Sequence, residues 1–230
     1  MRFSTMSAMK YVLQTLTKPE KPEVLKFLID NFRVDEPLTR AAQMSPNEAE
    51  MCFNAVMDRC LKHPLSVVAR CKESDEIVGC MLNSVWRKSD AFDDVAAKRD
   101  DFTFGSDRLP TRTVAEILNE VHSKFWSVRP RHDVVIHFEI VSVSKRFQRQ
   151  GMASKMLEWT EDVEKLKSVN ATAIMAEATS LGNQVLLTRK GYEIIHSLKL
   201  NTKRDSEGRQ ILNCDNGTDR VLLVVKEFEY

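Results

Sequence analysis

The chain has 230 residues, of which 43% are hydrophobic and 29% charged, as expected of a folded globular protein with a sizeable core. Its 34 basic and 33 acidic residues leave a net charge of +1, which disfavours nucleic acid or an anionic membrane as a partner. No run of about 18 apolar residues and no signal-peptide pattern occurs, so we expect a cytoplasmic protein without a membrane span. The five cysteines lack C-x-x-C or Cys/His ligand spacing, which predicts reduced thiols and no metal site.

The first half of the chain predicts, in order, a strand, two helices and two strands over residues 10–17, 20–32, 45–61, 65–71 and 77–86. The second helix has a clear start, because Ser45 can cap it, Pro46 suits its first turn and Glu48 completes a capping box. The two strands are joined by a polar turn and predict an antiparallel hairpin, with a bulge expected near Asn83. Residues 34–38 predict a break, since the residue before a proline avoids the helical region.

The second half predicts a helix, a strand, a helix, a strand, a helix and two strands over residues 111–125, 134–143, 152–166, 172–178, 180–190, 192–200 and 219–230. His122 lies beside the apolar face of the first of these helices, and we interpret it as a structural residue. The polar segment 87–110 is either a functional loop or a surface insertion. The element order predicts one α/β (α+β) domain that spans residues 1–230.

A strand, a tight turn and a helix start follow one another over residues 135–157. The strand is rich in Val and Ile, and the turn carries Gly151 and Ala153, which leave room for a ligand near the backbone. The first amides of the following helix have no partner within the helix, so they favour an anion such as phosphate. The alternative is an ordinary strand–turn–helix with small residues for packing.

The turn sequence Q-R-Q-G-M-A, residues 148–153, resembles the pyrophosphate-binding pattern of the GCN5-related N-acetyltransferases, (Gln/Arg)-x-x-Gly-x-(Gly/Ala). The resemblance implies a mixed central sheet flanked by helices, acetyl-CoA as cosubstrate, no metal, and a CoA-binding core over about 134–192. It implies that the strand pairs with the pantetheine arm and the turn binds the pyrophosphate, with Lys145 or Arg149 adding charge. The residues expected to bind the cosubstrate are Val141, Ser142, Val143, Gln148, Arg149, Gln150, Gly151, Met152, Ala153, Ser154 and Asn183.

The segment D-E-P-L, residues 35–38, resembles the invertebrate-type arylalkylamine N-acetyltransferases of this family. The resemblance implies that Glu36 is the general base; the alternative is that Glu36 only caps a turn before Pro37. His137 and Glu139 lie two residues apart on one strand, so both face the same side of the sheet. They match the positions of a two-histidine relay in the vertebrate-type enzymes, with a glutamate replacing the second histidine. His137 could carry a proton, but a satisfied structural histidine is the alternative.

The general acid is not defined by the resemblance. Many family members have a tyrosine where this chain has Leu187. The invertebrate-type enzymes use serines, which match Thr179 and Asn183 here. Thr179 keeps a hydroxyl and is the candidate acid, whereas Asn183 is expected to contact the pantetheine arm.

The resemblance predicts direct transfer of an acetyl group to a primary amine, with a base that removes the amine proton. An arylalkylamine (dopamine, serotonin, tyramine or octopamine) would need an aromatic pocket, for which Phe32, Phe53 and the long segment are candidates. A polyamine or protein amine would instead suit the acidic residues of that segment, Asp93, Asp94, Asp100 and Asp101. A catalytically weak, CoA-binding regulatory protein is a further alternative. We expect a small-molecule amine as partner, no nucleic acid, no membrane, and a monomer or weak homodimer.

Overall fold

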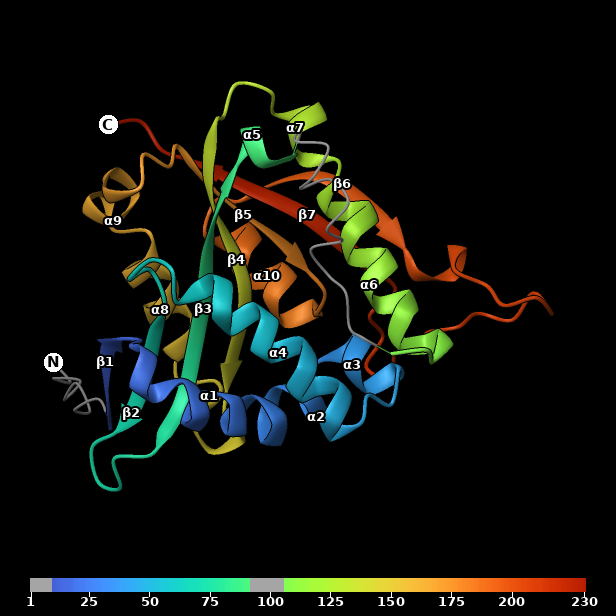
Figure 1. The fold of residues 1–230 in the computed structure, drawn as a ribbon, viewed down its shortest axis with the longest axis horizontal. Helices are drawn as coiled ribbons and strands as arrows, with labels where there is room; N and C mark the ends of the chain where they lie inside the picture. The colour runs from blue at the N-terminus through green and yellow to red at the C-terminus, as the bar shows by residue number, and fades with distance from the viewer. Residues whose placement is uncertain (1–9, 92–105) are drawn as a thin grey trace, which may run out of the picture.

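Seven strands form one sheet in the structure, a computed structural model that describes residues 10–91 and 106–230 (Figure 1). The sheet order is β1-β2-β3-β4-β5-β7-β6, and only the β4–β5 pair is parallel. The mixed sheet confirms the predicted fold class. The strands are β1 (Tyr11–Thr15), β2 (Val67–Cys71), β3 (Ile77–Arg87), β4 (Val134–Val143), β5 (Ala173–Ala178), β6 (Glu193–Lys199) and β7 (Arg220–Glu227).

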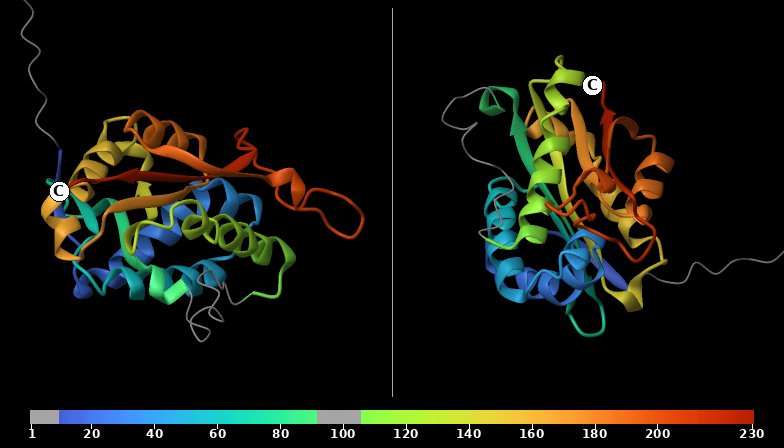
Figure 2. Two further views of the ribbon diagram at one scale, coloured as in Figure 1. Left: turned by 90° about the horizontal axis from the view of Figure 1, so that it is seen from above. Right: turned by 90° about the vertical axis from the view of Figure 1, so that its right-hand side faces the viewer.

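Helices cover both faces of the sheet (Figure 2). One face carries α1 (Lys21–Phe27), α2 (Arg33–Asp35), α3 (Pro37–Ala41), α4 (Pro46–Cys60) and α6 (Leu109–His122). The other face carries α8 (Met152–Thr160), α9 (Val163–Ser168) and α10 (Leu181–Arg189). The short helices α5 (Lys88–Ala91) and α7 (Phe125–Val128) follow β3 and α6. Each face therefore has its own apolar core, which agrees with the near-continuous burial of the central strands.

Side-chain caps and prolines set the helix ends. Ser45 and Glu48 form the predicted capping box at the start of α4. The long helix predicted after the Gly151 turn is instead two helices, because the Asp162 side chain accepts a hydrogen bond from the Glu164 amide and starts α9. The predicted break at 34–38 narrows to one residue: α2 ends at Asp35, and Pro37 already belongs to α3.

The β3–β4 pairing contains the predicted bulge. Leu82 pairs with Ile140 and Asn83 pairs with Phe138, so Glu139 between them has no opposite residue. Such an extra residue bends the strand and redirects its side chains. As a result Ile140 packs in the same core as Val135, although in a regular strand residues an odd number of positions apart face opposite sides.

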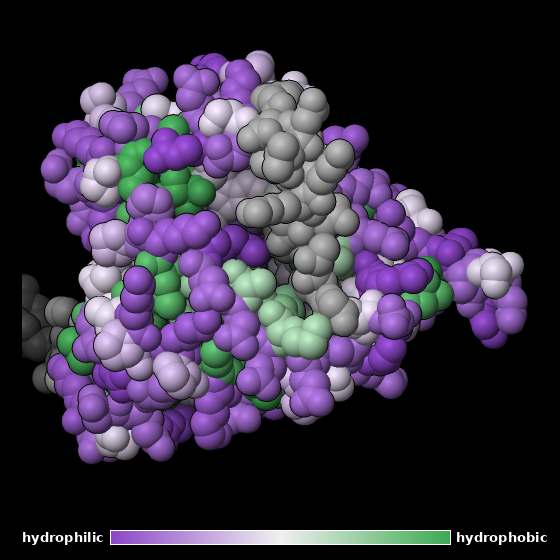
Figure 3. All heavy atoms as spheres, viewed as in Figure 1, coloured by the Kyte–Doolittle hydropathy of each residue, from purple (hydrophilic) through white to green (hydrophobic). Residues whose placement is uncertain are grey.

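The face of the molecule that carries α1 and α4 is mostly polar (Figure 3). On this face, hydrophobic residues form separate small areas rather than one continuous patch. None of the helices in residues 10–91 and 106–230 is long and apolar enough to cross a bilayer.

Candidate active site

Strands β4 and β5 separate halfway along β4. Their pairing runs from Val135 with Ala173 to Phe138 with Ala176, and we call this last pair the branch point. Beyond it, β4 pairs with β3 along one edge, while no described strand pairs with its other edge. That second edge offers backbone groups for hydrogen bonds with an extended ligand. Residues 141–143, expected to bind pantetheine, lie on this part of β4.

The turn after β4 leaves open space in front of the start of α8. Gly151 has a φ of 79° at the cap position of α8, and a Cβ there would have no neighbour within 4 Å, so the space in front of it is open. The Lys155 amide bonds to the Gly151 carbonyl, which leaves the amides of residues 152–154 without a partner inside the helix. The side chains of Gln148 and Gln150 brace the turn through bonds to the Val143 and Arg146 carbonyls, both at 2.9 Å.

Asn183 lies in the first turn of α10, the helix that follows β5. The Ser180 hydroxyl caps this helix by accepting from the Asn183 amide at 3.2 Å. The Asn183 Oδ1 atom is buried and accepts no hydrogen bond from the described residues. A buried acceptor without a donor suits a ligand that brings an N–H group.

Glu36 reaches the same region from α2 and α3. It is extended (φ −72°, ψ 130°) because Pro37 follows, and its Oε2 atom caps α3 by accepting from the Thr39 amide at 2.7 Å. Asp35 lies 3.4 Å from the Lys145 Nζ atom, so this segment sits beside the turn after β4.

The residue Glu36 is 8% exposed, and burial raises the pKa of its carboxyl group above the ordinary value of 4.5. The Thr39 and Leu38 amides and the nearby Thr179 and Thr39 hydroxyls lower the pKa by less than burial raises it. The Oε1 atom is buried, and no donor among the described residues lies within hydrogen-bonding geometry of it. Glu36 is therefore both a helix cap and a carboxylate with one oxygen available to a ligand or a water molecule.

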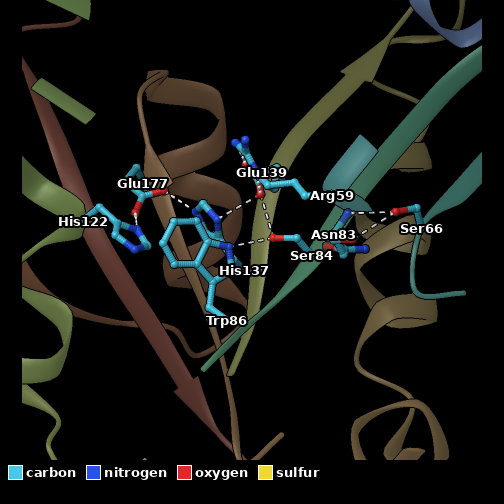
Figure 4. A network of polar contacts seen from close by, with 9 residues as sticks. All are labelled: Arg59, Ser66, Asn83, Ser84, Trp86, His122, His137, Glu139 and Glu177. Atoms are coloured by element: carbon cyan, nitrogen blue, oxygen red, sulfur yellow. Dashed lines mark hydrogen bonds and ion pairs between the residues drawn. The ribbon is translucent and has the colours of Figure 1, made fainter. Parts of the chain in front are cut away.

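His137 and Glu139 belong to a buried cluster at the branch point (Figure 4). The His137 Nε2 atom lies 2.5 Å from the Glu177 carboxylate, and its Nδ1 atom lies 3.3 Å from the Glu139 carboxylate. Arg59 on α4 binds Glu139 through two nitrogens, at 2.5 and 2.7 Å. We call the seven residues of this group the ion cluster: Arg59, Ser84, Trp86, His122, His137, Glu139 and Glu177.

The rest of the ion cluster completes its hydrogen bonds. Ser84 donates to Glu139 at 2.6 Å, and the Trp86 indole donates to Ser84 at 2.7 Å. His122 lies 2.9 Å from the second oxygen of Glu177, which supports its predicted structural role. Every charged group is thus bound by others in a nearly dry environment.

The charges of the cluster fix its protonation. Burial alone would lower the pKa of His137, but the carboxylates of Glu177 and Glu139 outweigh it and raise this pKa to about 10. Burial would likewise raise the pKa of Glu177, but the charge of His137 lowers it to about 2. The pKa of Glu139 is held well below its ordinary range, against burial, by His137 and Arg59. His137 is therefore a cation and both carboxylates are anions at neutral pH, so none of the three is poised to take a proton.

The ligand atoms of His122, His137 and Glu177 lie within 4.8 Å of one another, close enough in principle for a metal ion. Each of these atoms already takes part in a hydrogen bond between the three side chains, at 2.5 and 2.9 Å. The positive charge of His137 and Arg59 also balances the two carboxylates without an added cation. We therefore interpret the group as an ion-pair cluster.

Sequence reasoning found part of this site. Thr179 lies close enough to Glu36 to affect its pKa, and Asp35 contacts Lys145 of the turn, so these predicted residues are near one another; their roles stay predictions. Sequence reasoning missed the partners of His137 and Glu139, which come from α4, β3 and β5. A signal existed for Glu177, because a glutamate in the apolar strand I-M-A-E-A requires a partner.

The predicted aromatic pocket is only partly visible. Phe53 is 1% exposed and packs edge-on against Phe32 with ring centroids 5.7 Å apart, so its ring belongs to the core. Phe32 is half-buried. The acidic residues Asp93, Asp94, Asp100 and Asp101 lie outside the described residues.

The segment between β6 and β7 also contacts α3, because the Cys214 thiol lies 3.6 Å from the Pro37 carbonyl oxygen.

Comparison with known proteins gives structural relatives only. No family model and no curated protein sequence matches the chain. Arylalkylamine N-acetyltransferase 2 from Aedes aegypti superposes with a TM-score of 0.79 at 19% identity, covering 95% of this chain and 99% of the other. The polyamine N-acetyltransferase of Drosophila melanogaster, which forms N-acetylagmatine, gives 0.74 at 16% identity over 95% and 100%. Arabidopsis thaliana Naa50, bound to a bisubstrate analogue that contains CoA, gives 0.52 at 9% identity over 96% and 100%.

These likenesses extend over nearly the whole chain, so they describe its fold and not a shared local motif. They confirm the resemblance drawn from Q-R-Q-G-M-A and D-E-P-L at the level of the fold. The chain has the fold of the GCN5-related N-acetyltransferases.

Proposed function

We propose that this protein transfers the acetyl group of acetyl-CoA to a primary amine. The observation that carries the proposal is Glu36, a buried carboxyl group with a raised pKa and an oxygen without a described donor, in a segment that contacts the turn after β4 through Asp35 and Lys145. A base of raised pKa, a site for a pyrophosphate and a groove for an extended arm are what acetyl transfer from CoA requires. The arylalkylamine and polyamine N-acetyltransferases with the same fold support this reading.

The cosubstrate would bind along three features. Its pyrophosphate would accept hydrogen bonds from the amides of residues 152–154, with Lys145 and Arg149 nearby in sequence to balance charge. The pantetheine arm would pair with the free edge of β4 at residues 141–143, as an added strand does. The Asn183 Oδ1 atom would accept from a pantetheine amide.

The reaction needs a neutral amine. Glu36 would remove one proton from the ammonium group, directly or through a water molecule, and the freed nitrogen pair would attack the thioester carbonyl. A β4 amide beyond the branch point would stabilise the negative oxygen that forms. The carbon–sulfur bond then breaks, the nitrogen loses its second proton and the thiolate gains one; the Thr179 hydroxyl next to Glu36 is our candidate to pass this proton from the nitrogen to the sulfur.

We propose an arylalkylamine as the amine substrate, on the D-E-P-L segment and the half-buried Phe32 ring near it. A polyamine is the second candidate, because the polyamine N-acetyltransferase has the same fold over the whole chain. The two differ in charge: an arylalkylamine places an apolar ring, and a polyamine a second cation, beyond the reacting nitrogen.

One assay tests the proposal. The purified protein is incubated with acetyl-CoA and dopamine, serotonin, tyramine, octopamine, agmatine, spermidine or a peptide with a free N-terminus, and the release of free thiol is recorded. We expect thiol release that depends on an amine and is fastest with the arylalkylamines. Measurable CoA binding without thiol release for any amine would instead support the regulatory, non-catalytic alternative.

A further inference from the structure

We propose that His137 is a positioning residue, which ties β4 to β5 at the branch point and so sets the spacing of the opening that receives acetyl-CoA. The inference rests on the proposed function for the identity of the ligand. It assigns to His137 a role in holding the two strands, in place of the proton relay that its position in the sequence suggests.

The ion pair of His137 crosses the last backbone pair between the strands. Phe138 pairs with Ala176 at that position. His137 is one residue before it on β4, and Glu177 is one residue after it on β5. Their 2.5 Å contact therefore links the strands just where backbone hydrogen bonds stop linking them. A side-chain bond at this place resists further separation of the strands.

Each end of this link is fixed to the surrounding helices. On the β4 side, Glu139 is the bulged residue, and Arg59 anchors it to α4 with two hydrogen bonds. On the β5 side, the second oxygen of Glu177 is bound to His122 of α6. A bidentate guanidinium–carboxylate pair defines direction as well as distance. The link therefore holds the strands at one spacing rather than merely in contact.

The surroundings of His137 leave its ring one orientation. The side chain is 0% exposed, and the Trp86 ring packs against its edge with centroids 4.9 Å apart. The charged groups that face it are Glu139 on its own strand, Glu177 on β5 and, through Glu139, Arg59 on α4, with the His122 ring of α6 5.2 Å away. Two cations balance two anions, so loss of either partner leaves an uncompensated buried charge.

The expected consequence is weaker binding of the cosubstrate. Without the link, the strands sample spacings that do not fit the pantetheine arm. The apparent Kd then equals the intrinsic Kd divided by the fraction of molecules that keep the correct spacing. If about one molecule in ten keeps the correct spacing, the Kd for acetyl-CoA rises about tenfold. The chemical step in the bound state should change little, because Glu36 is not part of the ion cluster.

The test compares His137→Gln, Glu177→Gln and the double variant with wild type. Each amide keeps the size of the side chain approximately and removes one charge. His132→Gln is the matched control, because His132 is also a buried histidine bound to a glutamate, Glu227, before the N-terminal end of β4. Circular dichroism confirms folding, calorimetry gives the Kd for acetyl-CoA, and initial rates give kcat and both KM values.

We expect each single variant to raise the Kd and KM for acetyl-CoA about tenfold, with kcat and the KM for the amine nearly unchanged. In the double variant the Kd for acetyl-CoA should rise by less than the product of the two single-variant increases, because this variant removes one charge of each sign. His132→Gln should bind like wild type.

Two results would overturn the inference. A lower melting temperature with an unchanged Kd would mean that His137 only stabilises the core. A fall in kcat by about 100-fold or more with an unchanged Kd would return His137 to proton transfer. Wild-type protein that binds acetyl-CoA but acetylates no amine would overturn the proposed activity alone, since the Kd comparison needs no turnover.

Discussion

At the scale of single residues, the environment of each carboxylate decides which one can act as a base. Glu139 and Glu177 are buried, but the cations beside them hold their pKa values low. Glu36 is equally buried and has no cation bound to it among the described residues, so burial raises its pKa. Glu36 and Glu139, both candidates in the sequence, therefore have pKa values shifted in opposite directions, which is why we propose Glu36 as the base.

The substitution Glu36→Gln tests this assignment with little structural change. The glutamine oxygen can still accept from the Thr39 amide and cap α3, but it cannot take a proton. We expect kcat to fall by about 10²–10⁴, with the Kd for acetyl-CoA unchanged. In wild type, kcat/KM should rise with pH through a pKa above 4.5, since Glu36 must be ionised to act. This rise of kcat/KM with pH should be absent in Glu36→Gln.

Glu36→Ala provides the comparison for the capping role. It removes the cap as well as the base, so it should lose about 1 kcal/mol of stability that Glu36→Gln keeps. Thermal unfolding distinguishes the two variants. An unchanged rate in both would exclude Glu36 as the base.

Asn183 offers a second test at this scale. Its Oδ1 atom is buried without a described donor, and the capping bond at this residue uses its backbone amide. Asn183→Ala should therefore leave α10 intact and weaken acetyl-CoA by about 3–10-fold, the value of one hydrogen bond. Calorimetry with adenosine 3′,5′-bisphosphate, which lacks the pantetheine arm, is the control and should give the wild-type Kd. Equal weakening of both ligands would contradict the contact with pantetheine.

At the scale of elements, the turn before α8 is where local sequence was most informative. Gly151 is left-handed, as the turn into α8 requires, and a Cβ added at this position would meet no protein atom within 4 Å. The capping box of α4 was equally readable, because Ser45 and Glu48 are three residues apart. Such features depend on neighbours in the sequence, which is why they were predicted correctly.

The contacts of the ion cluster could not be predicted from local sequence patterns, because they join residues far apart in the chain. Arg59 and Glu139 are 80 residues apart, and His137 and Glu177 are 40 apart. Their pairing depends on the bulge at Glu139 and on where β4 and β5 separate, which are set by the whole sheet. The sequence placed His137 and Glu139 on one face, but it could not tell a proton relay from a charge-balanced pair.

Gly151→Val tests the turn as an element. A β-branched residue is strained at a φ of 79°, and its side chain would occupy the open space in front of the first α8 amides. We expect weaker binding of both acetyl-CoA and adenosine 3′-phosphate 5′-diphosphate, which keeps the pyrophosphate, by about tenfold or more. Gly208→Val is the matched control, because Gly208 has a φ of 78° and open surroundings in the segment between β6 and β7. Unchanged affinity in Gly151→Val would remove the turn from the cosubstrate site.

At the scale of the whole molecule, the ion cluster links five elements across one face of the sheet. Arg59 comes from α4, Ser84 from β3, His137 and Glu139 from β4, and Glu177 from β5, with His122 joining α6. Such a buried network couples the stability of the fold to pH, because its charges exist together only while His137 is protonated and both carboxylates are ionised. The same link that spaces the strands therefore has a thermodynamic signature.

The pH dependence of unfolding measures this coupling. The pKa of His137 is raised from 6.5 to about 10, so its contribution is complete below pH 6.5 and is lost as the pH rises towards 10. The pKa of Glu177 is lowered from 4.5 to about 2, so its contribution is complete above pH 4.5 and is lost as the pH falls towards 2. In urea titrations, wild type should lose about 1–3 kcal/mol of unfolding free energy between about pH 6 and pH 9. The double variant His137→Gln/Glu177→Gln should lose clearly less over the same range, and an equal loss in both proteins would show that the cluster does not carry the dependence.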